Sequence, residues 1–515
     1  MVTINTIKTV GMKAVPVIVE TQITSGIGIH LVGLADLAVR ESLLRTITAL
    51  QANGFRIPGK KIVINLTPAD LYKNGSGHDL AIALSLICES GQKVISDLDK
   101  WLVFGELGLD GSIRSVPGAL QAAMCAIKNG YKCIVPAQEV EELRPFVGQE
   151  SVYGIATLVD AIKLISEENE FPTIAETPVK ESANKGPYPK SAWDSIIGQE
   201  AARRALEIAA AGGHNVILIG APGSGKSMLA KALTEILPPM TDAESLENAL
   251  IYSVSGRGYQ DYYGNRRPFR APHYSASVSA MFGGGSADVI MPGEVSLANN
   301  GVLYLDEAPQ FPKSLMEAIR GPIEDKKVII SRLKSRIEYP ARFQLVLASN
   351  PCPCGYYGEG DRCTCTPSQR LAYLSKLNGP VMDNVAIQLW VHPMAEPQDG
   401  KPFPKHESAD AVLERVAKAR QIQAERFKDE SYKLNDEMPS KDIERFVALS
   451  QECKVLIEKI ITNLGLSARS YSRILKIART IADLDGSTEV QPQHVAEASG
   501  YRFLDRLGAQ MTPYE

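Results

Sequence analysis

Short apolar runs alternate with amphipathic stretches over the first 165 residues of the chain. Four runs have the length and β-branched content of strands, and three longer stretches carry apolar residues at helical spacing. The expected strands are Ala14–Glu20, Lys61–Leu66, Trp101–Glu106 and Lys132–Val135, and the expected helices are Ala35–Asn53, His78–Ser90 and Gly118–Asn129. The alternation predicts an α/β domain at residues 1–165.

A change in composition follows this domain. Residues 166–190 are rich in Glu, Lys, Pro, Ser and Thr and have no sustained apolar period, which is typical of an exposed linker. In residues 191–400 an expected helix and three strand-like runs indicate a second α/β unit with a largely parallel sheet. The helix is Gln199–Ala211, and the runs are Asn215–Ile219, Val302–Leu305 and Gln344–Ala348. Residues 401–515 have helical periodicity throughout, which predicts a separate helical domain.

Composition narrows the class of protein. The 515 residues carry a net charge of −4, so any surface that binds nucleic acid has to be local. The longest apolar runs are far shorter than the ~20 residues of a membrane span. The N-terminus lacks a charged segment followed by an apolar one, so no secretory signal is expected. We therefore expect a cytoplasmic protein with no membrane partner.

A glycine-rich phosphate loop is the clearest chemical signal. Residues 220–227, GAPGSGKS, fit the pattern G-x-x-x-x-G-K-S, and they lie between a predicted strand and a predicted helix. Gly220, Gly223 and Gly225 allow backbone N–H groups to surround phosphates. Lys226 would neutralise the β- and γ-phosphates, and the Ser227 hydroxyl would bind Mg²⁺. The motif predicts a site for ATP and Mg²⁺.

Two further strands would complete this nucleotide site. The run Val302–Leu305 ends in Asp306 and Glu307, of which the first would hold Mg²⁺ through water and the second would activate the attacking water. Asn350, at the end of the next strand, could orient the same water. Taken alone, Asn350 would be a turn residue. The pair Asp306 and Glu307 is a weak signal by itself and indicates a nucleotide site only together with the phosphate loop.

Half of the eight cysteines lie within fourteen residues: Cys352, Cys354, Cys363 and Cys365. Four thiolates on a glycine-containing loop can converge on Zn²⁺. We therefore expect a structural zinc site that braces the loop after Asn350. The alternative is two pairs of reduced structural cysteines.

The order of these motifs resembles the magnesium-chelatase-like AAA+ ATPases, in particular the bacterial competence-type ComM/YifB group. The resemblance rests on GEVSLANNGVLYLDEAP at 293–309 and FQLVLASNPCPCGYYG at 343–358, and it extends to FRAPHYS at 269–275, GLSARSYSRILKIARTIADL at 465–484 and HLVGLADLAVRES at 30–42. It implies a homo-hexameric ring ATPase that moves on DNA and drives branch migration during natural transformation. In that family Asn350 matches the first sensor. Arg469 matches a second sensor on a helical lid, although by itself it would be a helix-surface arginine.

The same resemblance points to a DNA-facing hairpin. Residues 326–340 alternate like two strands with a turn near Lys334 and Ser335. In a ring, copies of Arg332, Lys334 and Arg336 would meet in the pore and contact the phosphate backbone without sequence preference. The alternative is a solvated surface hairpin. The glycine run at 283–285, within the helical insertion of this branch, could be a pore loop or a linker.

One position departs from the family pattern. Members usually carry an arginine, donated to the neighbouring subunit, where this chain has Asn384. Such a finger is worth roughly 10³–10⁵ in rate, and an amide cannot replace it. Either another arginine serves, with Arg320 and Arg370 as candidates, or the chain is an ATP-binding protein with slow hydrolysis. A chelatase-like remodeller of a protein client is a further alternative.

The N-terminal domain resembles the proteolytic domain of Lon, which has a ribosomal-S5-like fold. Gly77 lies where Lon-type enzymes carry the serine nucleophile, and Leu120 lies at the position of the partner lysine. A Ser/Lys dyad needs both groups, so the domain is expected to be a non-proteolytic scaffold or DNA-binding module, like the related domain of RadA. Lys73 and Ser76 would allow a shifted dyad.

Overall fold

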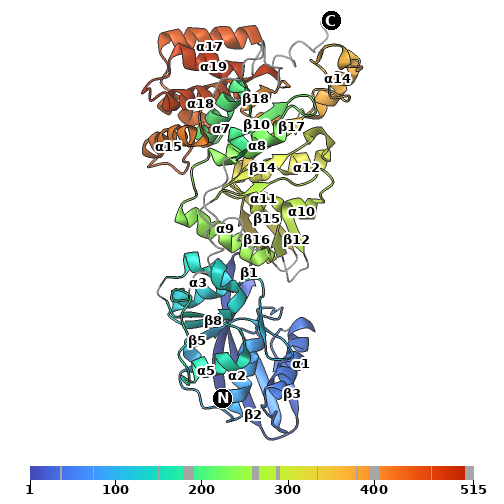
Figure 1. The fold of residues 1–515 in the computed structure, drawn as a ribbon, viewed down its shortest axis with the longest axis vertical. Coiled ribbons are helices and arrows are strands. Elements are labelled where there is room, and N and C mark those ends of the chain that lie inside the picture. Colours follow the sequence, from blue (N-terminus) through green and yellow to red (C-terminus); the bar gives the residue numbers. More distant parts are fainter. Residues whose placement is uncertain are drawn as a thin grey trace.

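The computed structural model describes residues 1–34, 37–73, 75–148, 150–177, 191–257, 266–285, 290–332, 335–377, 381–393, 406–464 and 467–504. The molecule is elongated (Figure 1): an N-terminal α/β unit forms one end, and a second α/β unit with the C-terminal helices forms the other. Among the described residues, no helix combines the length and apolarity that a membrane crossing requires.

The N-terminal unit is a seven-stranded mixed sheet with helices against it. Its strand order is β3-β4-β2-β1-β5-β8-β9, with antiparallel pairing of β1 to β2 and of β2 to β4 and parallel pairing elsewhere. The strands are β1 (Val2–Val10), β2 (Lys13–Thr24), β3 (Gly28–Val32), β4 (Lys61–Thr67), β5 (Trp101–Val103), β8 (Lys132–Pro136) and β9 (Val152–Ile155). The helices are α1 (Leu37–Ala52), α2 (Asp79–Glu89), α3 (Ala119–Asn129), α4 (Val140–Leu143) and α5 (Leu158–Ile165), and β6 (Glu106–Leu107) pairs with β7 (Ile113–Arg114).

The segment expected to be an exposed linker begins as part of this unit. The buried Ile174 donates its N–H to the Val152 carbonyl at 2.8 Å. The Arg144 guanidinium donates to the carbonyls of Ile174 and Thr177 at 3.1 and 2.7 Å. Residues 166–177 therefore pack on the N-terminal unit, and residues 178–190 lie outside the described part of the chain.

The second unit has a five-stranded, all-parallel sheet of order β11-β14-β17-β10-β18. Its strands are β11 (Phe269–Arg270), β14 (Val302–Leu305), β17 (Gln344–Ser349), β10 (Val216–Ile219) and β18 (Ile387–Trp390). Alternate residues of β10 belong to different cores: Val216 and Leu218 face one side, and Ile217 and Ile219 face the other. Burial on both faces explains why these strands read as continuous apolar runs.

Helices and two hairpins cover this sheet. The helices are α6 (Ser191–Asp194), α7 (Glu200–Gly212), α8 (Lys226–Glu235), α9 (Asp242–Ser255), α10 (Val278–Phe282), α11 (Glu294–Leu297), α12 (Lys313–Ala318), α13 (Arg320–Asp325) and α14 (Pro367–Leu374). One hairpin pairs β12 (Gly283–Gly285) with β13 (Ile290–Pro292), and the other pairs β15 (Lys327–Arg332) with β16 (Ser335–Pro340).

The C-terminal helices share a hydrophobic core with the sheet. They are α15 (Ala409–Arg426), α16 (Ile443–Phe446), α17 (Gln451–Leu464), α18 (Ala468–Leu484) and α19 (Pro492–Gly500). One hydrophobic cluster joins residues of α15 and α18 to α7 and β10. The small side chains of Ala209, Ala210 and Ala211 let α15 approach α7, and Gln423 donates to the Ala211 carbonyl at 3.1 Å.

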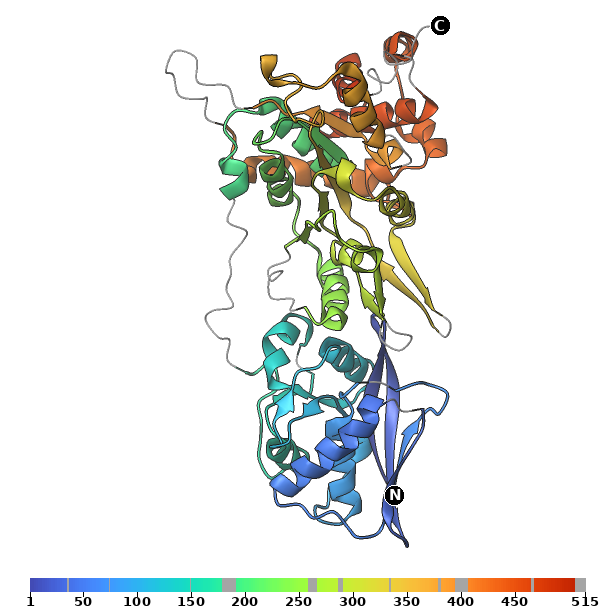
Figure 2. The ribbon, with the colours of Figure 1, turned by 90° about the vertical axis from the view of Figure 1, so that its right-hand side faces the viewer.

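The two units meet through α3 and α9 and through the turn between β1 and β2. Gln121 donates to the Leu250 carbonyl at 2.8 Å and accepts a hydrogen bond from Ser253 at 2.9 Å. A Cβ at Gly11, in the turn, would lie 2.6 Å from a methyl carbon of Ile337 in β16. Figure 2 shows the β15–β16 hairpin reaching down beside this turn. The hairpin is therefore supported by both units.

Candidate nucleotide site, hairpins and cysteine cluster

The carboxyl ends of three parallel strands bring the predicted nucleotide residues together. Ile219 of β10 pairs in register with Ser349 of β17, and Leu305 of β14 pairs with Leu347. The phosphate loop, Asp306 and Asn350 directly follow these strand ends. The parallel sheet therefore places all three at one edge, where ligands of such sheets bind.

Glycine is required in the phosphate loop for two different reasons. Gly223 and Gly225 have φ angles of 80° and 91°, which side-chain-bearing residues rarely adopt. At Gly220, a Cβ would lie 2.3 Å from the carbonyl oxygen of Val391. The loop then leads into α8 at Lys226, so the free amides of a helix N-terminus face the site.

Lys226 is held at the loop by backbone and side-chain oxygens. Its ammonium donates to the carbonyls of Gly220 and Ala221 at 2.7 and 2.9 Å and to the Asn350 side-chain oxygen at 3.4 Å. Burial lowers the pKa of Lys226, against the raising effect of Asp306 and Glu307. The contact to Asn350 joins the phosphate-binding residue to the expected first sensor.

The predicted magnesium ligands also lie together. The Ser227 hydroxyl is 3.0 Å from the Tyr304 hydroxyl and 3.4 Å from Asp306 Oδ2. Glu307 follows in a left-handed conformation, with φ of 50°, and both acids are exposed. A hydroxyl and a carboxylate are ligands that Mg²⁺ prefers. Tyr304 was not among the site residues predicted from the sequence, because nothing in the pattern of a buried strand shows which group a tyrosine hydroxyl contacts.

Arg469 lies elsewhere, in a pocket of about 190 Å³ that we call the Asn384 pocket. Its guanidinium forms an ion pair with Asp383. None of the residues that line the pocket comes from the phosphate loop. They are Arg320, Glu324, Asp383, Asn384, Ser440, Arg469, Ser472, Arg473 and Lys476. Within the described chain, the second-sensor candidate is thus grouped with Asn384 and not with Lys226.

The Asn384 amide fits an environment that is already cationic. Its oxygen accepts a hydrogen bond from Arg473 at 3.1 Å, and its nitrogen donates to Glu324 at 3.5 Å. Arg473 also pairs with Asp436 at 2.8 Å, and burial lowers the pKa of Lys476 to about 8. Of the two arginines proposed to replace the family's finger, Arg320 lines this pocket and pairs with Glu324 at 2.7 Å.

The other finger candidate, Arg370, is in a different place. It stacks on the ring of Tyr357, 4.3 Å from the ring centroid, beside the cysteine loop. The structure therefore separates the two candidates, and only Arg320 is a neighbour of Asn384.

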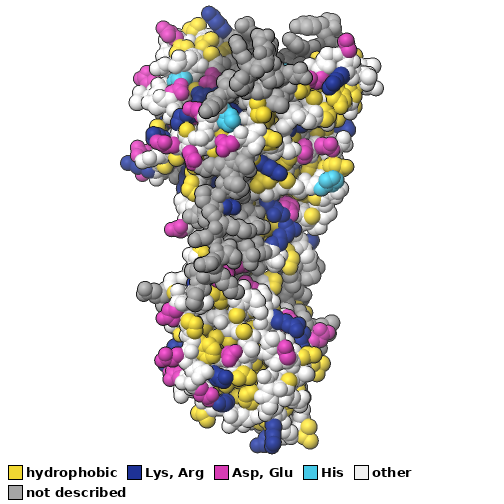
Figure 3. All heavy atoms as spheres, viewed as in Figure 1, with side chains coloured by type: hydrophobic (Ala, Val, Ile, Leu, Met, Phe, Trp, Pro, Cys, Tyr) yellow, Lys and Arg dark blue, Asp and Glu magenta, His cyan; other side chains and the backbone are white. Residues whose placement is uncertain are grey.

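The expected hairpin is present, with one buried and one exposed face. Val328, Ile330, Ile337 and Tyr339 are buried in a cluster with residues of the second sheet, and Val10 and Met12 of the N-terminal unit pack against that cluster. Arg332 and Arg336 are exposed, whereas Lys334 lies outside the described residues. Glu338 pairs with Lys327 at 3.1 Å and with Arg336 at 3.5 Å, so the exposed face is basic but partly neutralised. On the face of the molecule in Figure 3, basic and acidic side chains are likewise interspersed.

The glycine run at 283–285 is a strand that packs on this hairpin. A Cβ at Gly283 would lie 2.7 Å from Ile330, and a Cβ at Gly284 would lie 3.6 Å from the Arg332 guanidinium. Tyr339 donates to the Ile290 carbonyl of β13 at 2.8 Å. The two hairpins therefore lie side by side, and the run is not a linker.

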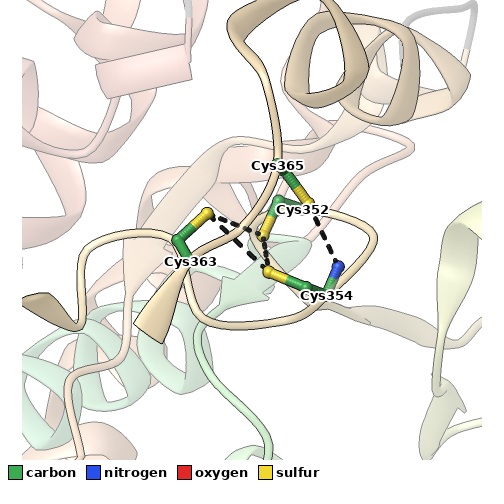
Figure 4. A group of neighbouring side chains, drawn as sticks. All are labelled: Cys352, Cys354, Cys363 and Cys365. Atoms are coloured by element: carbon green, nitrogen blue, oxygen red, sulfur yellow. Dashed lines mark hydrogen bonds between the residues drawn. The ribbon is translucent and has the colours of Figure 1, made fainter. Parts of the chain in front are cut away.

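The four clustered cysteines converge as a metal site would require. Their sulfurs all lie within 4.8 Å of one another, and Figure 4 shows them turned inward from the two arms of one loop. Cys352 Sγ is 3.3 Å from Cys354 Sγ and 3.8 Å from Cys363 Sγ, and the Cys354–Cys363 separation is 3.7 Å. Tetrahedral zinc with bonds of about 2.3 Å separates its sulfurs by about 3.8 Å. The thiols thus fit zinc closely.

The N-terminal unit offers no room for the Lon-type nucleophile. A Cβ at Gly77 would lie 2.4 Å from the Phe104 ring. Lys73 is buried and donates to the Pro68 carbonyl, and Ser76 donates to Glu106. The two residues of the shifted dyad therefore have separate partners in the structure.

Three family models match this chain, and all three describe subunit ChlI of magnesium chelatase. Residues 19–139 match the model of subunit ChlI of Mg-chelatase. Residues 192–398 match the model of magnesium chelatase subunit ChlI, and residues 406–502 match the C-terminal model of that subunit. The matches cover both α/β units and the C-terminal helices.

Individual relatives extend over nearly the whole chain. The protein named YifB of Escherichia coli is 41% identical over 98% of this chain and 97% of its own. The competence protein ComM of Haemophilus influenzae is 40% identical over 96% of each chain. A shorter match, 46% identical over 72 residues, links 14% of this chain to 11% of an archaeal Lon protease of Archaeoglobus fulgidus. Together with the parallel sheet, these matches confirm the predicted fold class.

Proposed function

This chain belongs to the YifB/ComM family of magnesium-chelatase-like AAA+ ATPases, and on that premise we propose that it is an ATP-driven, ring-forming motor that moves on DNA. One observation carries the proposal. A candidate nucleotide site, in which Ser227 contacts Asp306 and Lys226 contacts Asn350, is combined, in one chain, with an exposed basic hairpin. The nucleotide site would supply the energy of ATP hydrolysis, and the basic hairpin would bind a polyanion.

The chemistry of the motor follows from the residues at the sheet edge. Lys226 and the loop amides would hold the phosphates of ATP, and Ser227 and Asp306 would hold Mg²⁺. Glu307 would accept a proton from the attacking water, which Asn350 would orient. Magnesium, when bound, would neutralise charge that develops on the phosphates.

A ring explains why Arg469 is separate from the phosphate loop of its own chain. The Asn384 pocket holds four cations, Arg320, Arg469, Arg473 and Lys476, against three nearby acids, Glu324 and Asp383 in its lining and Asp436, which pairs with Arg473. In a head-to-tail ring, one surface of each copy faces a different surface of the next. We propose a homo-hexamer in which this pocket faces the γ-phosphate bound by the neighbouring copy, where cations stabilise the transition state.

DNA is proposed to contact the adjacent hairpins β12–β13 and β15–β16. Arg332 and Arg336 would meet backbone phosphates, which gives affinity without sequence preference. The relative named competence protein ComM supports a role in the uptake or recombination of DNA, and we propose branch migration of joint molecules during natural transformation.

We also propose that Cys352, Cys354, Cys363 and Cys365 hold one structural Zn²⁺. Four cysteine thiolates are a set that zinc takes in structural sites, and sulfur separations of 3.3, 3.8 and 3.7 Å suit it.

A second function is favoured by one observation. Glu338 neutralises part of the basic hairpin, as would suit a protein client better than DNA. A chelatase-like remodeller of a protein complex is therefore the alternative.

ATP turnover with and without forked and four-way DNA separates the two functions, in parallel with branch migration of a labelled four-way junction. The motor predicts DNA-stimulated turnover and junction movement that requires ATP. Turnover that no DNA accelerates, together with an immobile junction, would favour the remodeller.

A further inference from the structure

The cysteine loop touches the phosphate loop directly. Gly355 follows Cys354 and has φ of 89°, and a Cβ at this position would lie 2.9 Å from both Cγ and Cδ of Pro222. Pro222 lies between Gly220 and Gly223 in the phosphate loop. The Gly355 backbone is therefore seated against the segment that would surround the phosphates of ATP.

The far side of the cysteine loop is held by the end of β18. A Cβ at Gly358 would lie 3.1 Å from the Trp390 ring, and Tyr357 packs edge-on to Trp390 with 6.2 Å between the ring centroids. The Arg370 guanidinium lies over the Tyr357 ring. The loop is thus a wedge between Trp390 and Pro222, and a shift of the wedge would move the phosphate loop.

Regular secondary structure contributes little to the shape of this wedge. Between Cys354 and Cys363 the chain has one short 3₁₀ turn, Gly360–Arg362, and it contains three glycines with positive φ. Glycine-containing segments have high conformational entropy when they are not tied down. A metal that joins the thiols at both ends of the segment would remove most of that freedom.

We infer that a metal ion held by the four thiols positions Gly355 against Pro222, and thereby makes the nucleotide affinity of the phosphate loop depend on metal occupancy. This inference rests on the proposed zinc centre and is independent of the proposed action on DNA. It changes the simpler expectation that such a metal only braces the loop after Asn350. An ordered phosphate loop binds ATP more tightly, because less conformational entropy is lost on binding.

The test measures zinc content and ATP affinity on the full chain, without DNA. Zinc is removed with a zinc-selective chelator and then restored, and a fluorescent ATP analogue reports affinity at each stage. We expect about one zinc per chain, an affinity roughly tenfold weaker after removal, and recovery when zinc is restored. Cys363→Ser together with Cys365→Ser should reproduce the metal-free state.

A matched pair of glycine substitutions separates metal binding from its consequence. Gly355→Ala keeps all four thiols but pushes on Pro222, so zinc should stay bound while ATP affinity falls. Gly360→Ala, also at positive φ but with no atom within 4 Å of its Cβ, should leave both unchanged.

Three results would overturn the inference: protein that is folded but free of metal as purified, zinc-depleted protein that binds ATP as tightly as before, or Gly355→Ala protein with normal affinity. Absence of DNA stimulation would count against the motor alone, since none of these measurements includes DNA.

Discussion

The guanidinium of Arg469 is paired with the carboxylate of Asp383, and this ion pair holds it beside Asn384. The pairing keeps a second-sensor candidate on a surface pocket of its own chain. In the proposed ring, this cation would act on ATP that a neighbouring copy of the chain brings to the pocket with its phosphate loop. The relationship therefore links the ATPase chemistry to assembly.

Mixing two inactive variants would test that link. Arg320→Ala should leave ATP binding intact but slow hydrolysis by about 10³-fold, the low end of the effect of an arginine finger. Lys226→Ala should lose ATP binding. When the two are mixed, a phosphate loop from the first variant can meet an intact pocket from the second, and turnover should return at roughly a quarter of the wild-type value. Steady-state turnover across mixing ratios measures this.

The control for Arg320 is Arg370→Ala, which removes a guanidinium that stacks on Tyr357 away from the Asn384 pocket. If Arg370→Ala slows hydrolysis, mixing with Lys226→Ala should not restore the turnover, because Arg370 is not part of the Asn384 pocket. If Arg320→Ala turns over ATP at the wild-type rate, the finger is not Arg320. In that case, slow turnover by the native protein that Asn384→Arg accelerates would identify the chain as an impaired ATPase.

Glu307 should separate ATP binding from hydrolysis. Glu307→Gln keeps the size of the side chain and removes its basicity, so ATP binding should persist while turnover falls by at least about 10²-fold. Asp306→Asn should instead weaken Mg²⁺ binding and raise the Mg²⁺ concentration that turnover requires, because Asp306 is the acid in contact with Ser227. Equilibrium binding of a labelled ATP and a phosphate-release assay check the two results. Unchanged turnover in Glu307→Gln would remove Glu307 from the catalytic role.

Features formed by contiguous residues could be predicted from the sequence, whereas features that depend on tertiary contacts could not. The strand β10 and the phosphate loop are contiguous in sequence. The apolar run of the buried strand and the glycine spacing of the loop could therefore both be recognised. The strand β1 was missed because the buried residues Asn5, Thr6 and Lys8 interrupt its apolar pattern. Their burial depends on tertiary partners, such as the Trp101 carbonyl that accepts from Asn5 at 3.2 Å.

The Asn384 pocket shows the same limit for function. Arg320, Asn384 and Arg473 lie on separate elements far apart in sequence, and no spacing rule joins them. The contact of Gly355 with Pro222 was hidden for the same reason, since each glycine-rich segment looked complete by itself. By contrast, the four cysteines lie in one short segment, so their convergence could be predicted.

The exposed hairpin should contribute to DNA binding through charge alone. Arg332→Ala with Arg336→Ala should weaken binding at low salt and reduce the salt slope by about two, roughly one for each lost phosphate contact. Sequence preference should stay the same. Fluorescence anisotropy over a series of salt concentrations measures the slope.

A matched control for the hairpin is Lys418→Ala, an exposed cation on α15 that pairs with Glu414 at 2.8 Å. It should leave both affinity and slope unchanged. Glu338→Gln tests the hairpin from the other direction, since loss of this carboxylate frees Lys327 and Arg336 and should tighten DNA binding. An unchanged slope in the double arginine variant would place DNA elsewhere on the molecule.

A buried histidine should make the N-terminal unit sensitive to acid. His78, at the start of α2, is fully buried, and burial, together with the positive charges of Lys8 and Lys73, lowers its pKa to about 4. Because the pKa is lower in the folded protein than its ordinary value of 6.5, the folded state favours the neutral ring. The stabilisation is complete above pH 6.5 and is lost as the pH falls toward 4.

Between pH 7.5 and pH 5 this loss should amount to roughly 2 kcal/mol in the free energy of opening α2. Hydrogen exchange of peptides from Asp79–Glu89 measures it, and His78→Asn provides the comparison because it cannot titrate. Asp79 has the opposite trend, since burial raises its pKa to about 6, but it is present in both proteins and largely cancels in the difference. The wild-type protein should therefore lose protection on acidification by more than His78→Asn does. Equal losses in the two proteins would show that His78 is not held neutral by its surroundings.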